Sequence, residues 1–440
     1  MRSGRRKVKD RFCLCGTLLI GGLLLAAHGC GRTADRQGSV EITLWTMWSG
    51  QEEKNFQHVL NRYEDEHPGI RFHNLGAVSD DTKTIRALVA GVPPDFFTLA
   101  DPSYLGPLAR NHALRPLDTL FAASRLREKD FIPASLALCR YQDHLYGMPF
   151  LIDDAALLWN KQAFREAGLD PDRPPRTLEE LADDAVKLTK RDADGKIVQL
   201  GLRPLGDMYL PIALFGGKLV DPTTGRITAD DAANIAAYQW YKSLVEREGG
   251  INAVNAFASG FGSDQGGNNP FFVGKVAMMF NGEWNPYWVA RYAPQLQYDV
   301  APAPPPTARP DRARSTWLGG NVFCIPVESK HPKEAWDFMV WMQSPEAQEM
   351  FAHDMNNVPN IRSVLQDPRL RTVPPFRRKY AVFLDLADSP NAGYFPALPV
   401  TSRYINLMSV ATDKVLFGEE TPARALAEVR ERVQRELDQQ

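Results

Sequence analysis

The sequence predicts a soluble α/β protein built from two domains, and three observations support this prediction. The chain has 440 residues, which is too many for a single compact core. With 44% hydrophobic and 24% charged residues, its composition is typical of a globular protein. Apolar, β-branched segments also alternate with stretches of helical periodicity, a rhythm that indicates strands and helices packed in layers.

The beginning of the chain has the layout of a secretory signal. Residues 2–11 carry six basic side chains and one acid, and an apolar run over residues 12–27 follows. This run is shorter than the roughly 20 residues that span a bilayer. It ends in Ala-Ala-His-Gly before Cys30, which resembles a bacterial lipobox, although Ala27 stands where lipoboxes usually carry leucine. We therefore expect a signal peptide over residues 1–29 and a lipidated Cys30, with ordinary cleavage nearby as the alternative.

The mature chain is expected to lie in the periplasm or on the outer face of the cell membrane, held by a tether over residues 30–39. Removal of residues 1–29 leaves 45 basic and 52 acidic side chains, a net charge of −7, which argues against a surface for nucleic acid. Cys139 and Cys324 lie in apolar stretches, which favours two separate buried thiols over a disulfide. No zinc-ligand spacing occurs, so neither a metal nor a cofactor is expected.

The first domain is expected to begin with a buried strand over residues 40–48, which are β-branched and aromatic. A helix should follow, because apolar side chains recur at i, i+3, i+4 and i+7 from Phe56 to Tyr63 behind an acidic first turn. A Pro-Gly pair ends it, residues 70–72 resume as a strand, and residues 95–99 repeat the pattern. This βαβ rhythm predicts a parallel sheet covered by helices.

Further helices are expected along the rest of the chain. Thr177 can cap a helix over residues 178–188 while Glu180 reaches back to complete a capping box. A Thr-Pro pair opens the last expected helix, because proline is well placed at a first helical position. That last helix is expected near residues 422–437, and two others are expected near residues 229–248 and 332–343.

Six segments, taken in order, resemble one protein family. They read ITLWTMWSGQEEKNF, GVPPDFFTLADPSYLGPLARNHALRPLD, LYGMPFLIDDAALLWNKQAFREAGLDPDRPPRTLEELADDAVKLT, FFVGKVAMMFNGEW, LGGNVFCIPVESKHPKEAWDFMVWMQSPEAQ and VPNIRSV. Together they are similar to the family 1 extracellular solute-binding proteins, the group that includes maltose-binding protein, over nearly the whole mature chain. One such segment is a weak match, whereas six in the same order are specific.

The resemblance implies a periplasmic-binding-protein-like α/β fold, with two discontinuous lobes joined by a hinge and a ligand cleft between them. The N-terminal lobe would comprise residues 40–152 plus 319–371, and the C-terminal lobe residues 153–318 plus 372–440. The chain would cross between the lobes near residues 149–155, 317–321 and 371–376. The implied function is that of the extracytoplasmic substrate-binding component of an ABC importer, a monomer without catalytic activity that captures a carbohydrate by hinge closure and delivers it to the permease subunits.

Candidate ligand-binding residues follow from this resemblance and from the chemistry of sugars. Sugar hydroxyls pair with carboxylates and amides, and the apolar ring faces lie against aromatic side chains. Residues of both kinds follow the expected strand ends and crossovers, where ligands collect in α/β sheets. They are Trp48, Ser49, Gln51, Asp101, Tyr104, Asp153, Asp154, Trp284, Gly320, Asn321 and Arg362.

Several of these residues also have a purely structural interpretation. Trp48 and Trp284 are large aromatic residues of the kind that packs in a core. Asp101 is equally placed to cap a short helix. Asp153 and Asp154 point to opposite faces if their segment is extended, so at most one of them is expected to reach a given ligand.

Two alternative functions stay open on the sequence alone. A secreted carbohydrate-active enzyme would need two carboxylates about 5 to 10 Å apart, which excludes the adjacent Asp153 and Asp154 but not Asp101 with Asp153. No G-x-S-x-G or H-E-x-x-H motif occurs. The same fold could also hold a glycerol-phosphate diester or a polyamine. A phosphate calls for clustered basic side chains, and the expected cleft loops supply only Arg362, which could equally pair with a surface acid. A sugar is therefore the expected ligand.

Overall fold

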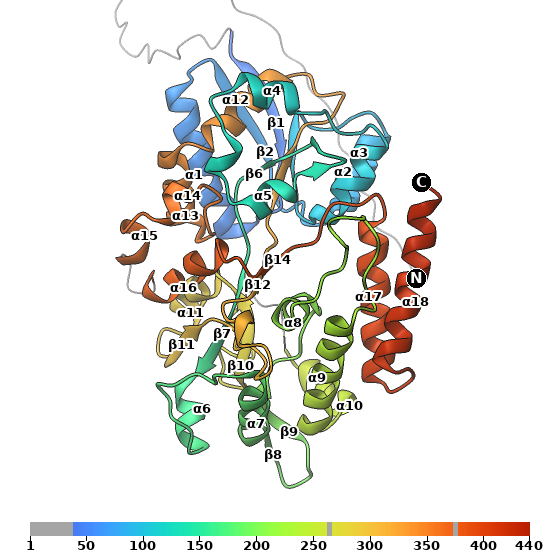
Figure 1. The fold of residues 1–440 in the computed structure, drawn as a ribbon. Helices are drawn as coiled ribbons and strands as arrows, with labels where there is room; N and C mark the ends of the chain where they lie inside the picture. The colour runs from blue at the N-terminus through green and yellow to red at the C-terminus, as the bar shows by residue number, and fades with distance from the viewer. Residues whose placement is uncertain (1–37, 262–265, 373–376) are drawn as a thin grey trace, which may run out of the picture. The chain divides into compact units, whose positions relative to one another are not determined.

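The computed structural model describes residues 38–261, 266–372 and 377–440. Val40–Gln440 cluster as one unit, and its two large sheets, of five strands each, occupy separate regions of the ribbon (Figure 1). The expected signal peptide and Cys30 lie outside the described residues, as does most of the third expected crossover. The α/β prediction is confirmed, because each sheet has helices packed against it and forms one lobe.

The first lobe is built on the sheet β2-β1-β3-β13-β6. Its strands are β1 (Val40–Trp45), β2 (Ile70–Leu75), β3 (Phe96–Leu99), β6 (Met148–Pro149) and β13 (Val322–Cys324). β1 pairs in parallel with β2 and β3, but β13 runs antiparallel to β3 and β6. The expectation of a parallel sheet is therefore corrected to a mixed one, because β13 enters this sheet on the return from the second lobe.

The helical periodicity of the first domain predicted its first helix correctly. α1 (Gly50–Glu66) buries the apolar stripe from Phe56 to Tyr63. The strand before it ends at Trp45, earlier than expected, and β2 extends to Leu75. The other elements along this part of the chain are α2 (Asp81–Val89), η1 (Pro102–Tyr104), α3 (Leu105–Arg110), α4 (Asp118–Ala123), η2 (Glu128–Asp130), α5 (Pro133–Ala137), β4 (Arg140–Tyr141) and β5 (His144–Leu145).

The second lobe is built on the sheet β11-β7-β10-β9-β8. Its strands are β7 (Ala155–Asn160), β8 (Lys190–Arg191), β9 (Ile197–Leu202), β10 (Val276–Gly282) and β11 (Tyr298–Ala301). β10 lies between β7, to which it is antiparallel, and β9, to which it is parallel. The helices and turns are α6 (Lys161–Glu166), α7 (Leu178–Leu188), α8 (Tyr209–Phe215), α9 (Ala232–Glu248), α10 (Ile251–Ala258), α11 (Asn285–Tyr292) and η3 (Pro310–Arg312).

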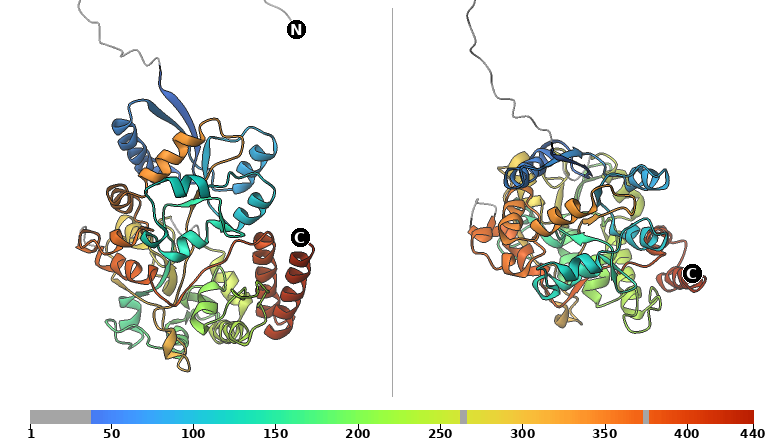
Figure 2. Two further views of the ribbon diagram at one scale, coloured as in Figure 1. Left: turned by 45° about the horizontal axis from the view of Figure 1, so that its top comes forward. Right: turned by 90° about the horizontal axis from the view of Figure 1, so that it is seen from above.

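After β13 the chain contributes helices to both lobes. These are α12 (Pro332–Trp341), α13 (Pro345–Met355), α14 (Arg362–Leu365), α15 (Arg369–Thr372), α16 (Arg377–Ala387), α17 (Thr401–Leu416) and α18 (Pro422–Asp438). α13 packs against α1, whereas α16 packs against β7 and β11. α17 and α18 contact each other and α9, and they lie side by side in both views of Figure 2. The two short strands β12 (Thr316–Trp317) and β14 (Ala392–Gly393) pair in parallel.

Local capping signals located the helices well. The hydroxyl of Thr177 accepts a hydrogen bond from the backbone N–H of Glu180 at 3.1 Å, and α7 begins at the next residue, as expected. The carboxylate of Glu180 reaches back to the N–H of Arg176 at 2.7 Å, one residue before the position of a regular capping box. α18 opens with Pro422 behind the cap Thr421. α9 begins three residues later than expected and α12 ends two residues earlier.

Two connecting segments pair with each other where the chain passes between the sheets. One joins β6 to β7 and the other joins β12 to β13. Their backbones meet at Asp153 and Gly319, where the N–H of Gly319 donates to the carbonyl of Asp153 at 2.9 Å. Gly320 follows with φ +141°, and a Cβ there would lie 2.5 Å from the carbonyl oxygen of Leu151. Only glycine fits this close approach of two chains.

The thiols of Cys139 and Cys324 are free and buried, as the apolar surroundings predicted. Burial raises the pKa of Cys139 well above its usual range, so this thiol stays protonated. Its Sγ donates to the carbonyl of Ser135 at 3.3 Å. Among the residues that the structure describes, no helix is long and apolar enough to cross a membrane.

Candidate functional site

A pocket of about 390 Å³ lies where the two crossovers meet the second sheet. Its walls come from the segment between β6 and β7, the loop from β9 to α8, the end of β10 and the return crossover. The lining residues are Asp153, Asp154, Ala155, Arg203, Pro204, Leu205, Gly206, Asp207, Leu210, Pro211, Phe280, Asn281, Gly282, Trp284, Trp317 and Gly319. This volume lies in the range of about 300 to 1,000 Å³ that is usual for small-molecule sites.

Three carboxyl groups converge at the end of the pocket nearest the crossovers. Glu283 is fully buried, and its Oε1 accepts a hydrogen bond from Nδ2 of Asn357 at 2.9 Å. Asp154 is 3% exposed, and neither of its carboxylate oxygens has a hydrogen-bond partner among the described residues. Burial raises the pKa of Asp153 to about 6, and a hydrogen bond with Glu283 opposes that rise. Burial and the neighbouring negative charges also raise the pKa of Asp154 and Glu283.

Two further carboxyl groups, those of Glu52 and Asp207, also have a raised pKa. Burial raises the pKa of Glu52, on the first turn of α1, to about 7, and the charge of Asp153 adds to the rise. Asp207 lines the pocket and is an exposed residue. Desolvation by the surrounding protein raises the pKa of its carboxyl group. Burial raises the pKa of Tyr209. The nearby carboxyl group of Asp207 adds to this rise, and that of Asp101 adds less.

Two tryptophan rings give the pocket its apolar surfaces. Trp284 is half-buried and packs across Gly282, where a Cβ would lie 2.3 Å from the indole ring, so only glycine fits beneath it. The indole Nε1 of Trp284 has no partner among the described residues. Trp317 stacks on Tyr209 with ring centroids 4.9 Å apart and planes at 20°, and Phe395 meets Tyr209 edge-on. These contacts hold Trp317 in place beside the pocket.

The candidate residues at the start of α1 lie away from this pocket. Trp48 is 5% exposed. The centroid of its ring lies 4.5 Å from that of Phe56 and 5.6 Å from that of Phe150. Its placement is that of a core aromatic, the structural interpretation left open by the sequence. Ser49 is exposed at the N-cap without a side-chain cap bond, and Gln51 donates from Nε2 to Asn55 at 2.9 Å.

The other candidates divide between structural positions and the cleft. Asp101 caps η1 by accepting from the N–H of Ser103 at 2.9 Å, and Tyr104 lies half-buried at the end of the same turn. Asn321 is 5% exposed and donates to the carbonyl of Ala100 at 3.1 Å. The pocket thus includes Asp153, Asp154 and Trp284 of the predicted set, while Gly320 serves the close approach of the crossovers.

Arg362 lies at a different place in the fold. Its guanidinium pairs with Asp388 at 3.1 Å, and it lines a separate cavity of about 470 Å³ with Arg125 and Lys129. The surface ion pair, which the sequence left open beside a sugar contact, is the interaction that the structure contains. We therefore leave Arg362 out of the candidate site.

Arg203, Asp207 and Trp317 line the pocket but were not among the predicted residues. Arg203 and Asp207 follow β9, and a polar loop after a strand of an α/β sheet is a general signal for a site. That signal was present in the sequence, but β9 itself was not among the expected strands. The sequence placed Trp317 in a crossover but did not predict it as a ligand-binding residue. The orientation of its ring depends on Tyr209, which lies far away in the chain.

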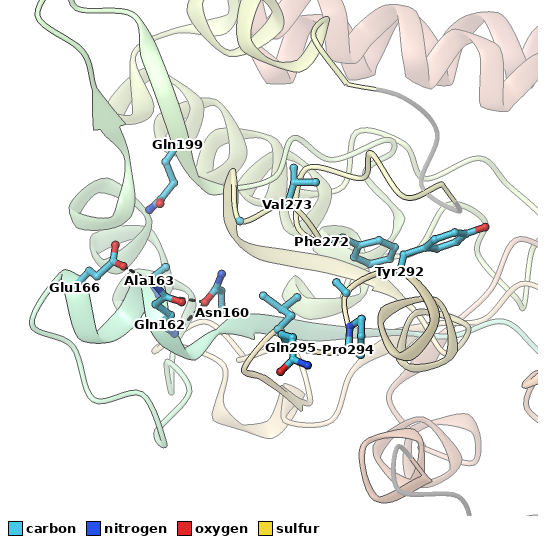
Figure 3. Close-up of a pocket in the computed structure, with 13 residues that line it drawn as sticks. Asn160, Gln162, Ala163, Glu166, Gln199, Phe272, Val273, Tyr292, Pro294 and Gln295 are labelled. Atoms are coloured by element: carbon cyan, nitrogen blue, oxygen red, sulfur yellow. Dashed lines mark hydrogen bonds between the residues drawn. The ribbon is translucent and has the colours of Figure 1, made fainter.

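A larger cavity, of about 550 Å³, lies elsewhere in the second lobe (Figure 3). The rings of Phe272 and Tyr292 lie at one end of it and Asn160 lies toward the other. Its amides serve the fold itself: Oδ1 of Asn160 caps α6, and Nε2 of Gln199 donates to the carbonyl of Leu188 at 2.8 Å. It includes none of the candidate residues, so we place the site at the smaller pocket.

Comparison with known proteins gives one family. The family described as bacterial extracellular solute-binding protein matches residues 48–349. A maltotriose-binding protein of Pyrococcus abyssi is 24% identical over 344 residues, which are 77% of this chain and 70% of that protein. The solved structure of CpMnBP1 with mannobiose bound is 28% identical, covers 89% of this chain and 99% of its own, and has a TM-score of 0.78.

A second solved structure is similar over the same extent. The GacH receptor of Streptomyces glaucescens, solved without ligand and with acarbose, is 25% identical and has a TM-score of 0.72. The match covers 91% of this chain and 99% of the receptor. The similarity to both structures therefore includes both lobes and the crossovers between them.

Proposed function

Because this chain belongs to the bacterial extracellular solute-binding proteins, we propose that it is the extracytoplasmic substrate-binding component of an ABC importer and that its ligand is a sugar. The observation that carries the proposal is the pocket at the crossovers, which combines carboxylates with tryptophan rings. These are the groups that sugar hydroxyls and sugar ring faces require. The relatives named for maltotriose and described with mannobiose support the same class of ligand.

In the proposed mechanism the ligand is held by both lobes and stabilises the closed state. Asp153, Asp154 and Trp284 would contact it from the second lobe and the crossover. A ligand shifts the protein toward closure only by its differential affinity for the closed state. The closed state would then be the form that the membrane permease recognises. The lobe boundaries proposed are residues 40–152 plus 319–371 and residues 153–318 plus 372–440.

A thermal-shift screen of the mature protein against mono-, di- and oligosaccharides tests this function. A ligand that binds only the folded state raises the melting temperature, by an amount that grows with its concentration relative to Kd. We expect at least one sugar to do so. If no sugar shifts the transition while a glycerol-phosphate diester does, the protein binds a different solute.

The same incubations test whether the protein has catalytic activity. We expect oligosaccharides to be returned unchanged after prolonged incubation, as a binding protein requires. Chromatography of the sugars is the measurement. Product formation that is lost on Asp101→Asn or Asp153→Asn would show that these carboxylates act as an acid and base pair and that the protein is a glycosidase.

We further propose that the mature protein is exported and anchored through a lipid on Cys30. The support is the apolar run of residues 12–27 and the small residues before Cys30. In intact cells, the protein should partition with membranes and begin at an acylated Cys30, and Cys30→Ser should release or misprocess it. An unmodified N-terminus at another residue, found by mass spectrometry, would contradict this proposal.

A further inference from the structure

Carboxyl groups outnumber basic groups in the pocket at the crossovers. The carboxyl groups of Asp153, Asp154 and Asp207 line it and that of Glu283 lies beside Asp154, whereas Arg203 is the basic residue among the described lining residues. Glu283 accepts a hydrogen bond from the amide of Asn357, and Asp207 accepts one from the backbone N–H of Tyr209, so both of these donors are neutral.

This arrangement differs from an acidic patch on an open surface. Asp154 is 3% exposed and Glu283 is fully buried, and both oxygens of Asp154 are without a hydrogen-bond partner among the described residues although Asp154 lines the pocket. A buried carboxylate without a partner is costly, because it loses water and gains nothing in exchange. A fold that keeps such a carboxyl group at a pocket has a use for it when the pocket is filled.

The hydroxyls of a neutral sugar can donate to these oxygens, but they carry no charge that would stabilise the ionised carboxylates. An ammonium group donates three hydrogen bonds and also neutralises charge, and charge-assisted hydrogen bonds are roughly twice as strong as neutral ones. Trp284 and Trp317 line the same pocket as the acids. Aromatic faces attract both a cation and the apolar face of a sugar ring. The ligand that fits all of these groups therefore has a ring and a positive charge.

We propose that the sugar bound here carries a protonated amine, and that Asp153, Asp154 and Asp207 receive its ammonium group. This inference rests on the proposed function, since it assigns a chemical class to the sugar in the same pocket. A linear polyamine has the charge but no ring face to lie against Trp284 and Trp317. The pocket volume of about 390 Å³ accommodates a ring as well as its amine.

Calorimetric titration of the mature protein at pH 7.5 with matched sugars tests the proposal. The probes are glucosamine, mannosamine, galactosamine and the β-1,4-linked glucosamine disaccharide, each beside its neutral hydroxyl counterpart and its N-acetyl form. We expect the amine that binds to do so about tenfold or more tightly than its hydroxyl counterpart, and acetylation to abolish the gain. Equal or tighter binding of the neutral sugar would overturn the inference and leave the proposed function standing.

Charge-neutral variants locate the ammonium group in the pocket. Asp207→Asn should reduce the preference for the amine over its hydroxyl counterpart about tenfold. The matched control is Asp194→Asn, which removes the same charge from an exposed turn outside the pocket and should leave the preference unchanged. An unchanged preference in Asp207→Asn would remove Asp207 from the site.

The remaining outcomes separate the two proposals. If every amine in the panel fails to bind, the inference is wrong, whatever the neutral sugars do. If spermidine binds while no sugar of either kind does, the proposed sugar-binding function and this inference are both overturned.

Discussion

Trp284→Ala is expected to weaken sugar binding by about tenfold to a thousandfold while the protein still folds. The ring of Trp284 is half-buried, lines the pocket and packs across Gly282, so its loss removes one apolar wall. Aromatic contacts contribute about 0.5 to 1.5 kcal/mol beyond the buried area, and the buried ring face adds to that. Calorimetric titration with the sugar found in the thermal-shift screen measures the change.

Trp336→Ala is the matched control, because it removes the same side chain from the core. Trp336 is 5% exposed on α12 and belongs to the main hydrophobic cluster. Its loss should lower the free energy of unfolding by roughly 3 to 5 kcal/mol, as large core truncations do. Melting curves of both variants separate binding from stability. If Trp284→Ala binds the sugar as tightly as the parent, Trp284 is a packing residue and the ligand lies elsewhere.

The fold was predictable because its signals are local. The stripe from Phe56 to Tyr63 and the cap at Thr177 each lie within a few residues of the element that they specify. The direction of β13 was not predictable in this way. It depends on which lobe the chain has just left, and that is a property of the whole topology.

The site was predictable only in part, because adjacency in sequence does not determine which side chains share a pocket. Asp153, Asp154 and Trp284 were identified from their places at a crossover and after a strand. Trp48 occupies a similar place after β1, but its ring turns into the aromatic core beside Phe150. Asp207 became recognisable only once the loop after β9 was placed opposite the crossover.

Asp154→Asn is expected to stabilise the unliganded protein at pH 7.5, by about 1 to 3 kcal/mol, because it removes a buried carboxylate that has no partner. Since burial raises the pKa of Asp154 in the folded state, the folded protein binds more protons than the unfolded chain above pH 4 or so. The free energy of unfolding therefore falls as the pH rises from that point, and the parent should be more stable near pH 5 than at pH 7.5.

An asparagine cannot ionise, so the advantage of Asp154→Asn should shrink toward pH 5. Asp153 and Glu52, with pKa values raised to about 6 and about 7, keep part of the same pH dependence in the variant. Melting temperatures of the parent, Asp154→Asn and the surface control Asp194→Asn, each at both pH values, measure the effect. If Asp154→Asn melts below the parent at pH 7.5, the carboxylate has a stabilising partner and its retention does not reflect ligand binding. If it melts higher but binds the sugar more weakly, the protein gives up stability at Asp154 to hold its ligand.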